Sequence, residues 1–462
     1  MTSIAVARDH PAEIRRTLQL ATPVMIGLVA SLGMNFVDTV MAGRLPDKDV
    51  ALAALATGGA LWSAMLMLAL GVLMALQPVV AQLDGAGLKQ EAAAAARQAF
   101  WLALAVALPF TGLMVGGGEV LSRLDVDAAI VPTADGYLGA LAWGAPAMCL
   151  VFLLRFFSEG TGHTRPTMYI GLFGVVVNVP LNWVLMFGKL GLPAMGARGC
   201  GYATSIVIWL QVLLLWWYVR GHHHFRGFAL FSRWDWPNLS SLREMLRIGL
   251  PIAVTIFVES SLFVAAALLI GRLGPIPTAG HLIAINFSAL MFMIPAGLTS
   301  AVTTRVGNAI GRGEPGAARY AGLIGLFLVL CSQTISAAVM LLLPGAIVSI
   351  YTSDETVAAV AVALLFYAAI FQLPDGIQIC AAGALRGLKD TFVPMFYNVV
   401  SYWLVGLTCG YYLTFQRELG PAGMWVGMIA GLSIGAVLMA TRFLRTSRRL
   451  QVSEAATPVP GP

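Results

Sequence analysis

The sequence predicts an all-α integral membrane protein with twelve transmembrane helices in two parallel six-helix repeats. Three observations predict this fold class: the composition, the apolar stretches and a set of residues that recur at one spacing. Of the 462 residues, 58% are hydrophobic and only 11% are charged, whereas soluble domains carry roughly 25% charged residues. We therefore expect membrane spans rather than soluble domains, and we ascribe the net charge of +6 to the loops rather than to a nucleic-acid partner.

The twelve apolar stretches are each long enough to cross a bilayer as a helix, which takes about 20 residues. The first covers residues 18–41 and follows Arg8, Arg15 and Arg16. It is too long for the apolar part of a signal peptide and no A-x-A-type cleavage site follows, so we expect it to be the first span. The stretches centre near residues 30, 65, 105, 145, 175, 207, 257, 292, 328, 370, 402 and 433.

The basic residues predict the orientation. With the N-terminus in the cytoplasm, 21 of the 28 Lys and Arg residues fall in cytoplasmic segments and 7 in outer loops. This bias agrees with an even number of spans and predicts that both termini are cytoplasmic. The five cysteines show no CxxC spacing, so we expect small buried residues rather than a disulfide or metal framework. They are Cys149, Cys200, Cys331, Cys380 and Cys409.

Four landmarks recur in the sequence, each 228 residues further along the chain. One constant spacing indicates a duplicated six-span unit. The matching landmarks are Pro23 and Pro251, Gly43-Arg44-Leu45 and Gly271-Arg272-Leu273, Pro146 and Pro374, and Pro166 and Pro394. Because six is even, both copies should point the same way about an axis normal to the membrane. We predict an N-terminal lobe over residues 1–228 and a C-terminal lobe over 236–462, joined by a cytoplasmic linker at about 220–240.

Three carboxylates lie inside the apolar stretches, namely Asp38, Glu259 and Asp375. Glu259 is twelve residues after Arg247 and thirteen before Arg272, so a helix would place it roughly 18 Å from either flank, near the middle of the bilayer. An acid there costs several kcal/mol unless it faces a cavity or carries a proton or cation. Such acids most often serve ion transport.

The acids do not follow the repeat, because the equivalent positions in the other copy hold other residues. Asp38 maps onto Ala266, Glu259 onto Ser31 and Asp375 onto Ala147. Residues of the scaffold are thus shared, while the charges are particular to each half. A binding site built on a symmetric frame would show this pattern.

Asn178 and Asn182 are four residues apart and should share one helix face, with Pro180 between them freeing the carbonyl of Val176. Together with Asp38 this face suits a hard cation such as Na⁺. Two alternatives stay open: the amides could simply bridge helices, and Glu259 and Asp375 could be structural acids kept neutral by burial. Asp38, only six residues from Arg44, could also be an interfacial acid.

Three other sets of residues are candidates for a role. The run His222, His223 and His224 could bind metal, but a solvated loop is the stronger expectation. Phe292 could meet a cation through its ring face or belong to the core. We also expect cytoplasmic ion pairs at helix ends between two acids, Glu159 and Asp390, and the basic residues Arg155, Arg165, Arg386 and Lys389.

Five segments of the sequence are distinctive, namely MNFVDTVMAGRL, RFFSEGTGHTRP, NVPLNWVLMFGKLGLPAMGARGCGYAT, FVESSLF and QLPDGIQICAAGALRGLKDT. They resemble the signature segments of the multidrug and toxic compound extrusion (MATE) family, in particular its NorM-like bacterial branch. The resemblance spans essentially all twelve predicted helices. It implies a V-shaped pair of six-helix lobes in the bacterial inner membrane and antiport of organic cations against Na⁺ or H⁺.

The resemblance also implies roles for individual residues. The cation-coupling positions would be Asp38, Asn178, Asn182, Thr204, Glu259 and Asp375, and Na⁺ could bind at Asp38, Asn178, Glu259 and Asp375. Asp354 matches an outer acidic position linked to drug contact, so Asp38, Phe292 and Asp354 are the expected substrate contacts. One departure is Leu282 after His281, where relatives often have Gln, which puts a polar drug contact there in doubt.

We therefore expect a monomeric multidrug efflux antiporter that exports hydrophobic organic cations, such as dyes and fluoroquinolone-like drugs, and needs no cofactor. The coupling ion, Na⁺ or H⁺, is left open. A membrane enzyme is disfavoured because the sequence has no HExxH motif, and a receptor or scaffold would not need three deep acids. The nearest alternative is a lipid or oligosaccharide flippase, which would need deep basic residues, and we expect none in the spans.

Overall fold

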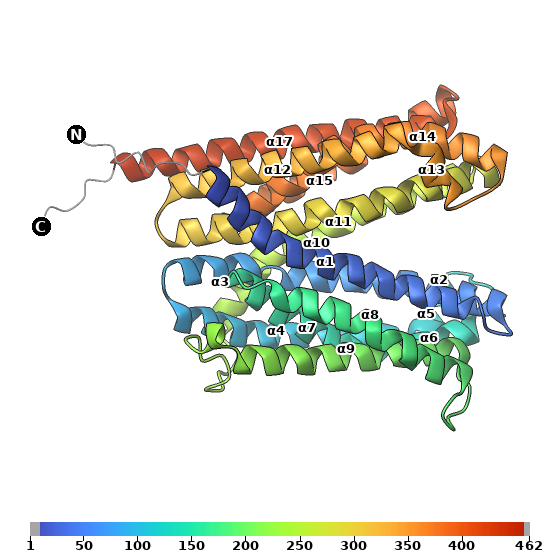
Figure 1. Cartoon of the computed structure of the whole chain (residues 1–462), viewed down its shortest axis with the longest axis horizontal. Helices are drawn as coiled ribbons and strands as arrows, with labels where there is room; N and C mark the ends of the chain where they lie inside the picture. Colours follow the sequence, from blue (N-terminus) through green and yellow to red (C-terminus); the bar gives the residue numbers. More distant parts are fainter. Residues whose placement is uncertain (1–9, 457–462) are drawn as a thin grey trace, which may run out of the picture. The chain divides into compact units, whose positions relative to one another are not determined.

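A computed structural model describes residues 10–456, and every element in this part of the chain is helical (Figure 1). Eleven of the helices described are long and apolar enough to cross a bilayer, and the bent pair α6–α7 makes a twelfth. The predicted spans are thus confirmed in order. The first half comprises α1 (His10–Ala42), α2 (Lys48–Leu73), α3 (Leu76–Gly85), α4 (Lys89–Val115), α5 (Gly117–Arg123), α6 (Val131–Ala142), α7 (Ala145–Gly160), α8 (Arg165–Phe187), α9 (Gly196–Gly221) and the short 3₁₀ turn η1 (His223–Phe225).

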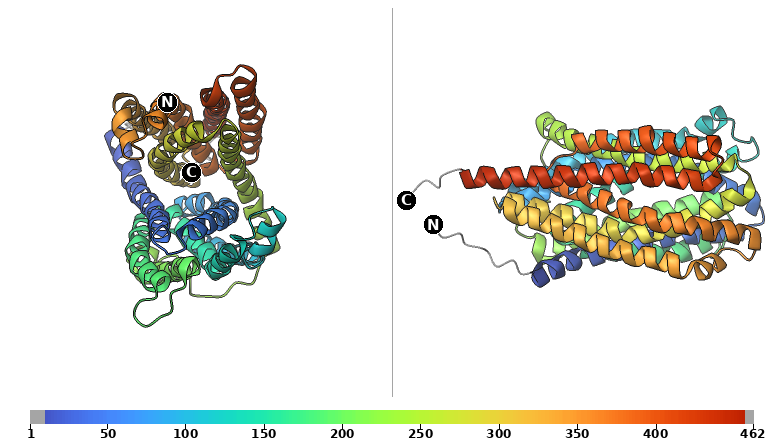
Figure 2. Two further views of the ribbon diagram at one scale, coloured as in Figure 1. Left: turned by 90° about the vertical axis from the view of Figure 1, so that its right-hand side faces the viewer. Right: turned by 90° about the horizontal axis from the view of Figure 1, so that it is seen from above.

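The second half repeats the pattern with longer helices. It comprises α10 (Leu239–Gly271), α11 (Pro275–Gly311), α12 (Pro315–Leu342), α13 (Pro344–Ser349), α14 (Glu355–Gly387), α15 (Phe392–Val399), η2 (Val400–Leu407), α16 (Thr408–Tyr411), η3 (Tyr412–Gln416) and α17 (Gly420–Ala456). Figure 2 shows α17 as a long red helix that runs beside α12 and α14.

The fourth span is broken at Trp143 and Gly144, where α6 and α7 meet at 45°. A Cβ atom on Gly144 would lie 2.8 Å from the Ser205 hydroxyl of α9, so only glycine allows this approach. Pro146 stands in the first turn of α7, where a missing N–H costs nothing. The bend therefore follows from a small residue and a helix-starting proline in sequence.

The eleventh span leaves α-helical geometry where it packs on α17. Its segments η2 and η3 are π-helical, a rare form that appears mostly as short turns at functional sites. A Cβ atom on Gly427 would lie 2.2 Å from the Gly410 nitrogen, and one on Gly431 would lie 2.5 Å from the Ser401 carbonyl oxygen. Glycines on both helices thus bring the two backbones into close contact.

The chain divides into two compact units. One comprises Ile26–Asp84 and Leu88–Phe257, and we call it the Asp38 unit. The other, the Asp375 unit, comprises residues 10–25, 85–87 and 258–456 of the part described. Apart from the short stretch 85–87, the chain passes between the units inside α1, after residue 25, and inside α10, after residue 257. These are nearly equivalent positions of the repeat. The predicted lobes, residues 1–228 and 236–462, describe the repeat in the sequence. The compact units are divided elsewhere, inside α1 and α10, so the lobe boundaries stay a prediction.

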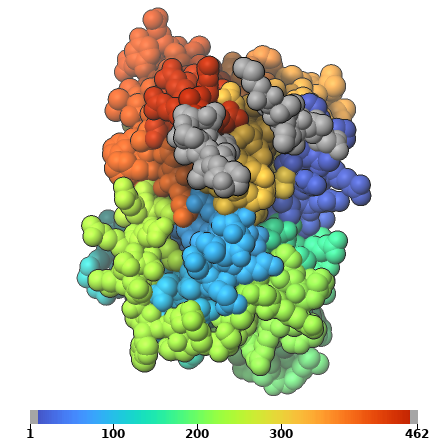
Figure 3. Space-filling view, turned by 90° about the vertical axis from the view of Figure 1, so that its left-hand side faces the viewer, coloured from blue at the N-terminus to red at the C-terminus, as the bar shows by residue number. Residues whose placement is uncertain are grey.

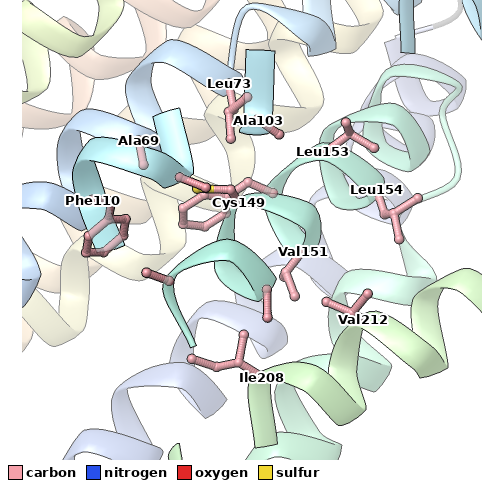
Figure 4. Packing of buried hydrophobic residues seen from close by; sticks show 14 of the residues in the cluster. Ala69, Leu73, Ala103, Phe110, Cys149, Val151, Leu153, Leu154, Ile208 and Val212 are labelled. Carbon is pink, nitrogen blue, oxygen red and sulfur yellow. The ribbon is translucent and has the colours of Figure 1, made fainter. Parts of the chain in front are cut away.

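The core of the Asp38 unit is a continuous apolar cluster drawn from α2, α4, α6, α7, α8 and α9. Phe110 of α4 packs on Trp62 of α2 with ring centroids 4.7 Å apart. Figure 4 shows Cys149 of α7 among these side chains, with Leu73 and Ala103 nearby. Cys149, Cys200 and Cys380 are buried, as expected for small core residues. Cys331 is exposed and Cys409 only partly buried, so the expectation was wrong for these two.

The segment after α9 is folded onto α4 instead of forming a loose linker. Arg97 of α4 is 9% exposed and pairs with Asp235 at 2.5 Å, and the Trp101 indole donates a hydrogen bond to the Asp235 carbonyl at 2.9 Å. Gln98 donates to the carbonyl of Trp236 at 2.9 Å. In the space-filling view the yellow-green residues of this segment border the light-blue start of α4 (Figure 3). The segment is therefore part of the Asp38 unit.

Gly71 of α2 gives a test of the helix packing inside the Asp38 unit. A Cβ atom there would lie 2.3 Å from the Cα atom of Ala253 on α10, so Gly71→Ala must push the helices apart. We expect a loss of about 1–3 kcal/mol, seen as a melting temperature lower by a few degrees. The measurement is a thermal-shift assay of purified protein.

The matched control is Gly59→Ala on the same helix, where an added Cβ atom meets nothing within 4 Å. It should leave the melting temperature unchanged or raise it slightly, because alanine favours the helix. Equal effects of the two substitutions would contradict the close packing of α2 on α10.

Candidate functional site

Three helices bring a carboxylate, two amides and a hydroxyl together in the Asp38 unit. The Asn182 amide of α8 donates to one oxygen of Asp38 on α1 at 2.6 Å, and Thr204 of α9 donates to the other at 3.3 Å. The same Asn182 nitrogen reaches the Asn178 carbonyl oxygen at 2.9 Å. All four side chains are buried. Asp38 is thus enclosed by side chains of three helices, and the structure groups the residues that the sequence singled out in this half.

The hydrogen bonds to Asp38 come from neutral donors. Asn182 and Asn178 lie one turn apart on α8, so both amides face the same neighbour. The side-chain oxygen of Asn182 and the amide nitrogen of Asn178 have no hydrogen-bond partner among the residues described. Carboxylate, amide and hydroxyl oxygens are the ligands of hard cations, and the same carboxylate could instead carry a proton. The arrangement is therefore suited to a monovalent cation or a proton.

Two residues beside Asp38 were missed at the sequence level. The Cys200 thiol lies within hydrogen-bonding reach of the carboxylate, and the ring of Tyr137 is close enough to interact with it electrostatically. Cys200 is buried, as predicted, but it contacts a charged group as well as apolar ones. Its position four residues before Thr204, on the same face of α9, is the signal that could have revealed it.

The other two acids lie together in the Asp375 unit. Asp375 of α14 is 3% exposed, and its carboxylate interacts electrostatically with that of Glu259 on α10, which is partly buried. One Asp375 oxygen, Oδ1, has no hydrogen-bond partner in the part of the chain described. Two carboxylates at close range repel each other when both are charged, so this site also favours a shared cation or proton.

Arg386 interacts with one of the two acids. It lies half-buried in the last turn of α14, at a helix end as expected, and interacts electrostatically with Glu259. The sequence did not reveal this interaction. The guanidinium offsets part of the negative charge and makes Glu259 electrostatically different from Asp38, whose hydrogen-bonding neighbours are neutral.

Buried amides surround Asp375, and the sequence analysis did not single them out. Gln333 of α12 donates to the Gln372 side-chain oxygen at 2.7 Å and to its backbone carbonyl at 3.0 Å. Gln378 of α14 donates to the Asn398 oxygen of α15 at 3.3 Å. All four amides are at most 1% exposed. Gln372 and Gln378 flank Asp375 at three residues on either side, a spacing that could have revealed them.

The predicted substrate contacts differ in how far their side chains are buried. Phe292 is partly buried on α11, and its contact with a substrate stays a prediction. Asp354 caps α14: its Oδ1 atom accepts hydrogen bonds from the Thr356 hydroxyl at 2.6 Å and from two backbone N–H groups. These hydrogen bonds, that of the hydroxyl first, hold the pKa of Asp354 below its usual range. Leu282, the departure noted above, is exposed on α11.

The three consecutive histidines are solvated only in part. His223 is exposed, as expected, whereas His222 and His224 are partly buried and pack against His163, with ring centroids 4.7 and 4.8 Å apart. His163 shares a hydrogen bond of 2.9 Å with the Tyr218 hydroxyl, and His224 one of 3.2 Å with the Thr161 carbonyl. Among the residues described, no group of three or more His, Cys, Asp or Glu side chains is placed to hold a metal ion.

Both acids expected to form ion pairs at helix ends do so. Arg155 pairs with the buried Glu159 at 2.7 Å, and Thr167 donates to the same carboxylate at 2.9 Å. Asp390 pairs with Arg442 of α17 at 2.7 Å, a residue that lies 52 positions further along the chain. This distant partner was not among the basic residues expected from the sequence, and tertiary packing brings it to Asp390.

A sequence model of the family named MatE matches residues 23–184 and again residues 251–412. The two matched segments begin at Pro23 and Pro251, the first pair of landmarks, which confirms the internal repeat read from the sequence. The chain belongs to the MatE family. Its fold is that of a multi-pass membrane transporter, and the predicted all-helical architecture of two repeated halves is correct.

Two curated MatE relatives are similar over nearly their whole length. The probable multidrug resistance protein NorM of Xanthomonas campestris pv. campestris is 44% identical over 444 residues, which cover 96% of each chain. The multidrug resistance protein PmpM of Pseudomonas aeruginosa is 41% identical, covering 95% of this chain and 92% of the relative.

Solved MatE structures show the same fold at low identity. A multidrug resistance MATE family transporter of the MOP superfamily, in an outward-facing conformation, superposes with a TM-score of 0.86 at 18% identity and covers 95% of this chain and 97% of its own. The eukaryotic MATE transporter AtDTX14 gives 0.84 at 20% identity, covering 96% of this chain and 99% of its own.

Asp354 allows charge and helix capping to be separated. Asn keeps the side-chain oxygen that caps α14, so Asp354→Asn should preserve the melting temperature and raise the KM for a cationic dye if the charge attracts the substrate. Asp354→Ala loses the cap as well and should lower the melting temperature. The KM for an uncharged substrate is the control and should not change in Asp354→Asn. A cationic-dye KM equal to that of the wild type in Asp354→Asn would leave Asp354 with the capping role alone.

The histidine cluster predicts a loss of stability in acid. Burial, and then the positive charge of its histidine and arginine neighbours, lowers the pKa of His163 to about 4, and burial also lowers the pKa of His222 and His224. The unfolded chain therefore binds more protons than the native chain between the ordinary pKa of about 6.5 and about 4. The free energy of unfolding should fall as the pH falls through this window.

The measurement is the melting temperature as a function of pH for the wild type and for His163→Gln. The substitution removes one titrating ring, so the decline in acid should be shallower than in the wild type. His10→Gln serves as the control because the His10 side chain is exposed. Parallel pH curves for the wild type and His163→Gln would contradict the assignment.

Proposed function

We propose that the protein is a cation-coupled multidrug efflux antiporter of the bacterial inner membrane, exporting hydrophobic organic cations in exchange for Na⁺ or H⁺. The observation that carries the proposal is the buried carboxylate of Asp38, which accepts hydrogen bonds from Asn182 and Thr204. Neutral donors leave the negative charge of a buried acid uncompensated. Such a group gains most from a proton or a cation, and either can be exchanged across the membrane.

The substrate class rests on charge and on the relatives. Two relatives similar over nearly their whole length are named multidrug resistance proteins. Acidic side chains within the spans attract cations, and the partly buried Phe292, in a segment that also holds two methionines, offers an adaptable apolar and aromatic contact. Small organic cations with apolar bodies, such as dyes and fluoroquinolone-like molecules, fit both features.

Exchange would follow from competition for the same acids. A carboxylate that holds Na⁺ or H⁺ no longer attracts an organic cation, so binding of the ion on the outside would release the drug there. One ion entering down about 100 mV releases about 2.3 kcal/mol, and a tenfold gradient adds about 1.4 kcal/mol. These free energies are sufficient to concentrate a neutral drug several-hundred-fold on the outside. In this scheme the protein is a monomer with both termini in the cytoplasm.

A lipid or oligosaccharide flippase is the alternative function. It would use basic side chains to hold an anionic head group, and Arg386 is a candidate for this task. Its interaction with Glu259 argues against that role, because the acid already offsets the positive charge. The antiporter is therefore the better-supported function.

The test is ethidium efflux from proteoliposomes under a Na⁺ gradient alone and a pH gradient alone. Glu259→Gln keeps the shape of the side chain and removes its charge, so it should abolish gradient-driven efflux while the protein still inserts and folds. The effect should reach at least tenfold in rate, since about 1.4 kcal/mol of lost ion binding is already a factor of ten. The control is Glu314→Gln, because Glu314 is exposed and pairs with Arg312 near a helix end.

The outcomes separate the functions. Efflux driven by one gradient in the wild type and in Glu314→Gln, but not in Glu259→Gln, supports the antiporter and names the coupling ion. Efflux that ignores both gradients overturns coupling. Transport of anionic lipid in place of ethidium would establish the flippase.

A further inference from the structure

Tyr402 is the largest polar side chain buried near the two acids of the Asp375 unit. It belongs to the π-helical segment η2 and has no exposed surface. Its ring lies in the apolar cluster that contains Phe371 and Trp425. Its hydroxyl lies beside Gln378 and within electrostatic reach of both Glu259 and Asp375. Neither the sequence motifs nor the acids themselves pointed to this tyrosine.

The hydroxyl of Tyr402 makes no hydrogen bond of normal geometry to any residue described, although it is buried. The same holds for Asp375 Oδ1, for the Gln378 side-chain oxygen, for the Asn398 amide nitrogen and for the Ser401 hydroxyl. A single buried polar atom without a partner already costs free energy. Four such atoms, together with Asp375 Oδ1 itself, lie on α14, α15 and η2 of one unit, and this group of polar atoms without partners among the residues described indicates a site that binds something polar.

The repeat allows the eleventh span, which contains Tyr402, to be compared with its equivalent in the first copy, α8. In the Asp38 unit the fifth span of the repeat, α8, supplies Asn178 and Asn182 to Asp38. The equivalent positions of the second copy are Gly406 and Gly410, which pack closely against α17 and carry no polar side chain. Buried polar side chains of the second copy stand earlier in the span, at Asn398, Ser401 and Tyr402, and one stands later, at Thr414. The two halves therefore place their buried polar side chains at different positions of the corresponding helix.

The π-helical geometry also fits this role. A π turn changes the direction in which successive side chains point, and such turns occur frequently at functional sites. In η2 it accompanies the close approach of Gly431 to the Ser401 carbonyl. The unit thus keeps an unusual backbone at the place where Tyr402 faces the acids.

We propose that Tyr402 is a direct ligand of the coupling ion in the Asp375 unit, its hydroxyl completing a site formed by Asp375 and Glu259 and positioned by Gln378 and Asn398. The hydroxyl can give a lone pair to Na⁺, or it can hydrogen-bond to a protonated Asp375. The charged groups that face it are Glu259 from α10 and Asp375 from α14, with Arg386 acting on Glu259. This inference rests on the proposed antiport and specifies its ion site.

The test is ion-dependent stabilisation of purified protein in nanodiscs. The melting temperature is followed in rising NaCl, with choline chloride keeping the ionic strength constant, and separately in falling pH without Na⁺. Ion binding to the folded state adds RT ln(1 + c/Kd) to the free energy of unfolding, where c is the ion concentration, so the melting temperature begins to rise near Kd, and a fit of this rise gives Kd as the midpoint of ion binding. Tyr402→Phe should shift the midpoint for the coupling ion by roughly tenfold toward higher ion concentration, the effect of losing one ligand to a charged partner.

Two features separate a ligand from a packing residue. Tyr402→Phe keeps the ring and removes a buried hydroxyl that makes no hydrogen bond of normal geometry to the residues described, so without the ion its melting temperature should equal or exceed that of the wild type. The matched control is Tyr411→Phe in the same span, because Tyr411 is 43% exposed. It should titrate as the wild type does.

The results distinguish this inference from the proposed function. If Asp375→Asn abolishes the ion response while Tyr402→Phe titrates like the wild type, the tyrosine is not a ligand and the antiport stands. A Tyr402→Phe protein that is less stable without the ion and unchanged in its midpoint has lost packing only, which also overturns the inference. A wild-type protein that responds to neither ion removes the antiport itself.

Discussion

The free-energy cost of carboxylates buried among apolar helices governs how this chain is built. Asp38 and Asp375 are almost fully buried, and each must be compensated by donors, by a proton or by a cation. The helices of the two units supply polar side chains in these regions: amides on α8, a hydroxyl on α9, and amides on α12, α14 and α15. The polar interior of each unit is therefore organised around an acid, and the apolar clusters enclose it.

The two units meet this requirement in different ways. Asp38 has hydrogen bonds from a neutral amide and a neutral hydroxyl. In the Asp375 unit two carboxylates interact with each other and an arginine acts on one of them. Repulsion raises the free-energy cost of charging both acids, and Arg386 offsets part of the charge of Glu259. The two halves of the repeat thus surround their acids with different charges.

Small residues let the helices come close enough to build these sites. Gly144 allows α9 to approach the bend between α6 and α7, and Gly427 and Gly431 bring α17 against the backbone of the eleventh span. Membrane helices associate by such close packing, because the lipid gives no hydrophobic driving force between them. The bends and π turns are the local consequence, and they determine which side chains face the acids.

The sequence by itself determined the membrane class, the twelve spans and the repeat, because composition, span length and a constant offset are properties of the chain read in order. It also singled out Asp38, Asn178 and Asn182, since an acid in an apolar stretch and amides one turn apart are visible locally, while Thr204 was named from the resemblance to the MATE family. Only the tertiary structure placed these side chains together, across 144 residues between Asp38 and Asn182. It alone revealed Cys200 beside Asp38, Arg386 beside Glu259 and the pairing of Asp390 with Arg442. The packing of His222 against His163 and the burial of Tyr402 were likewise visible only in the tertiary structure. The physical reason is that hydrogen bonds and charge pairs depend on distances in space, which helix packing sets and sequence spacing does not.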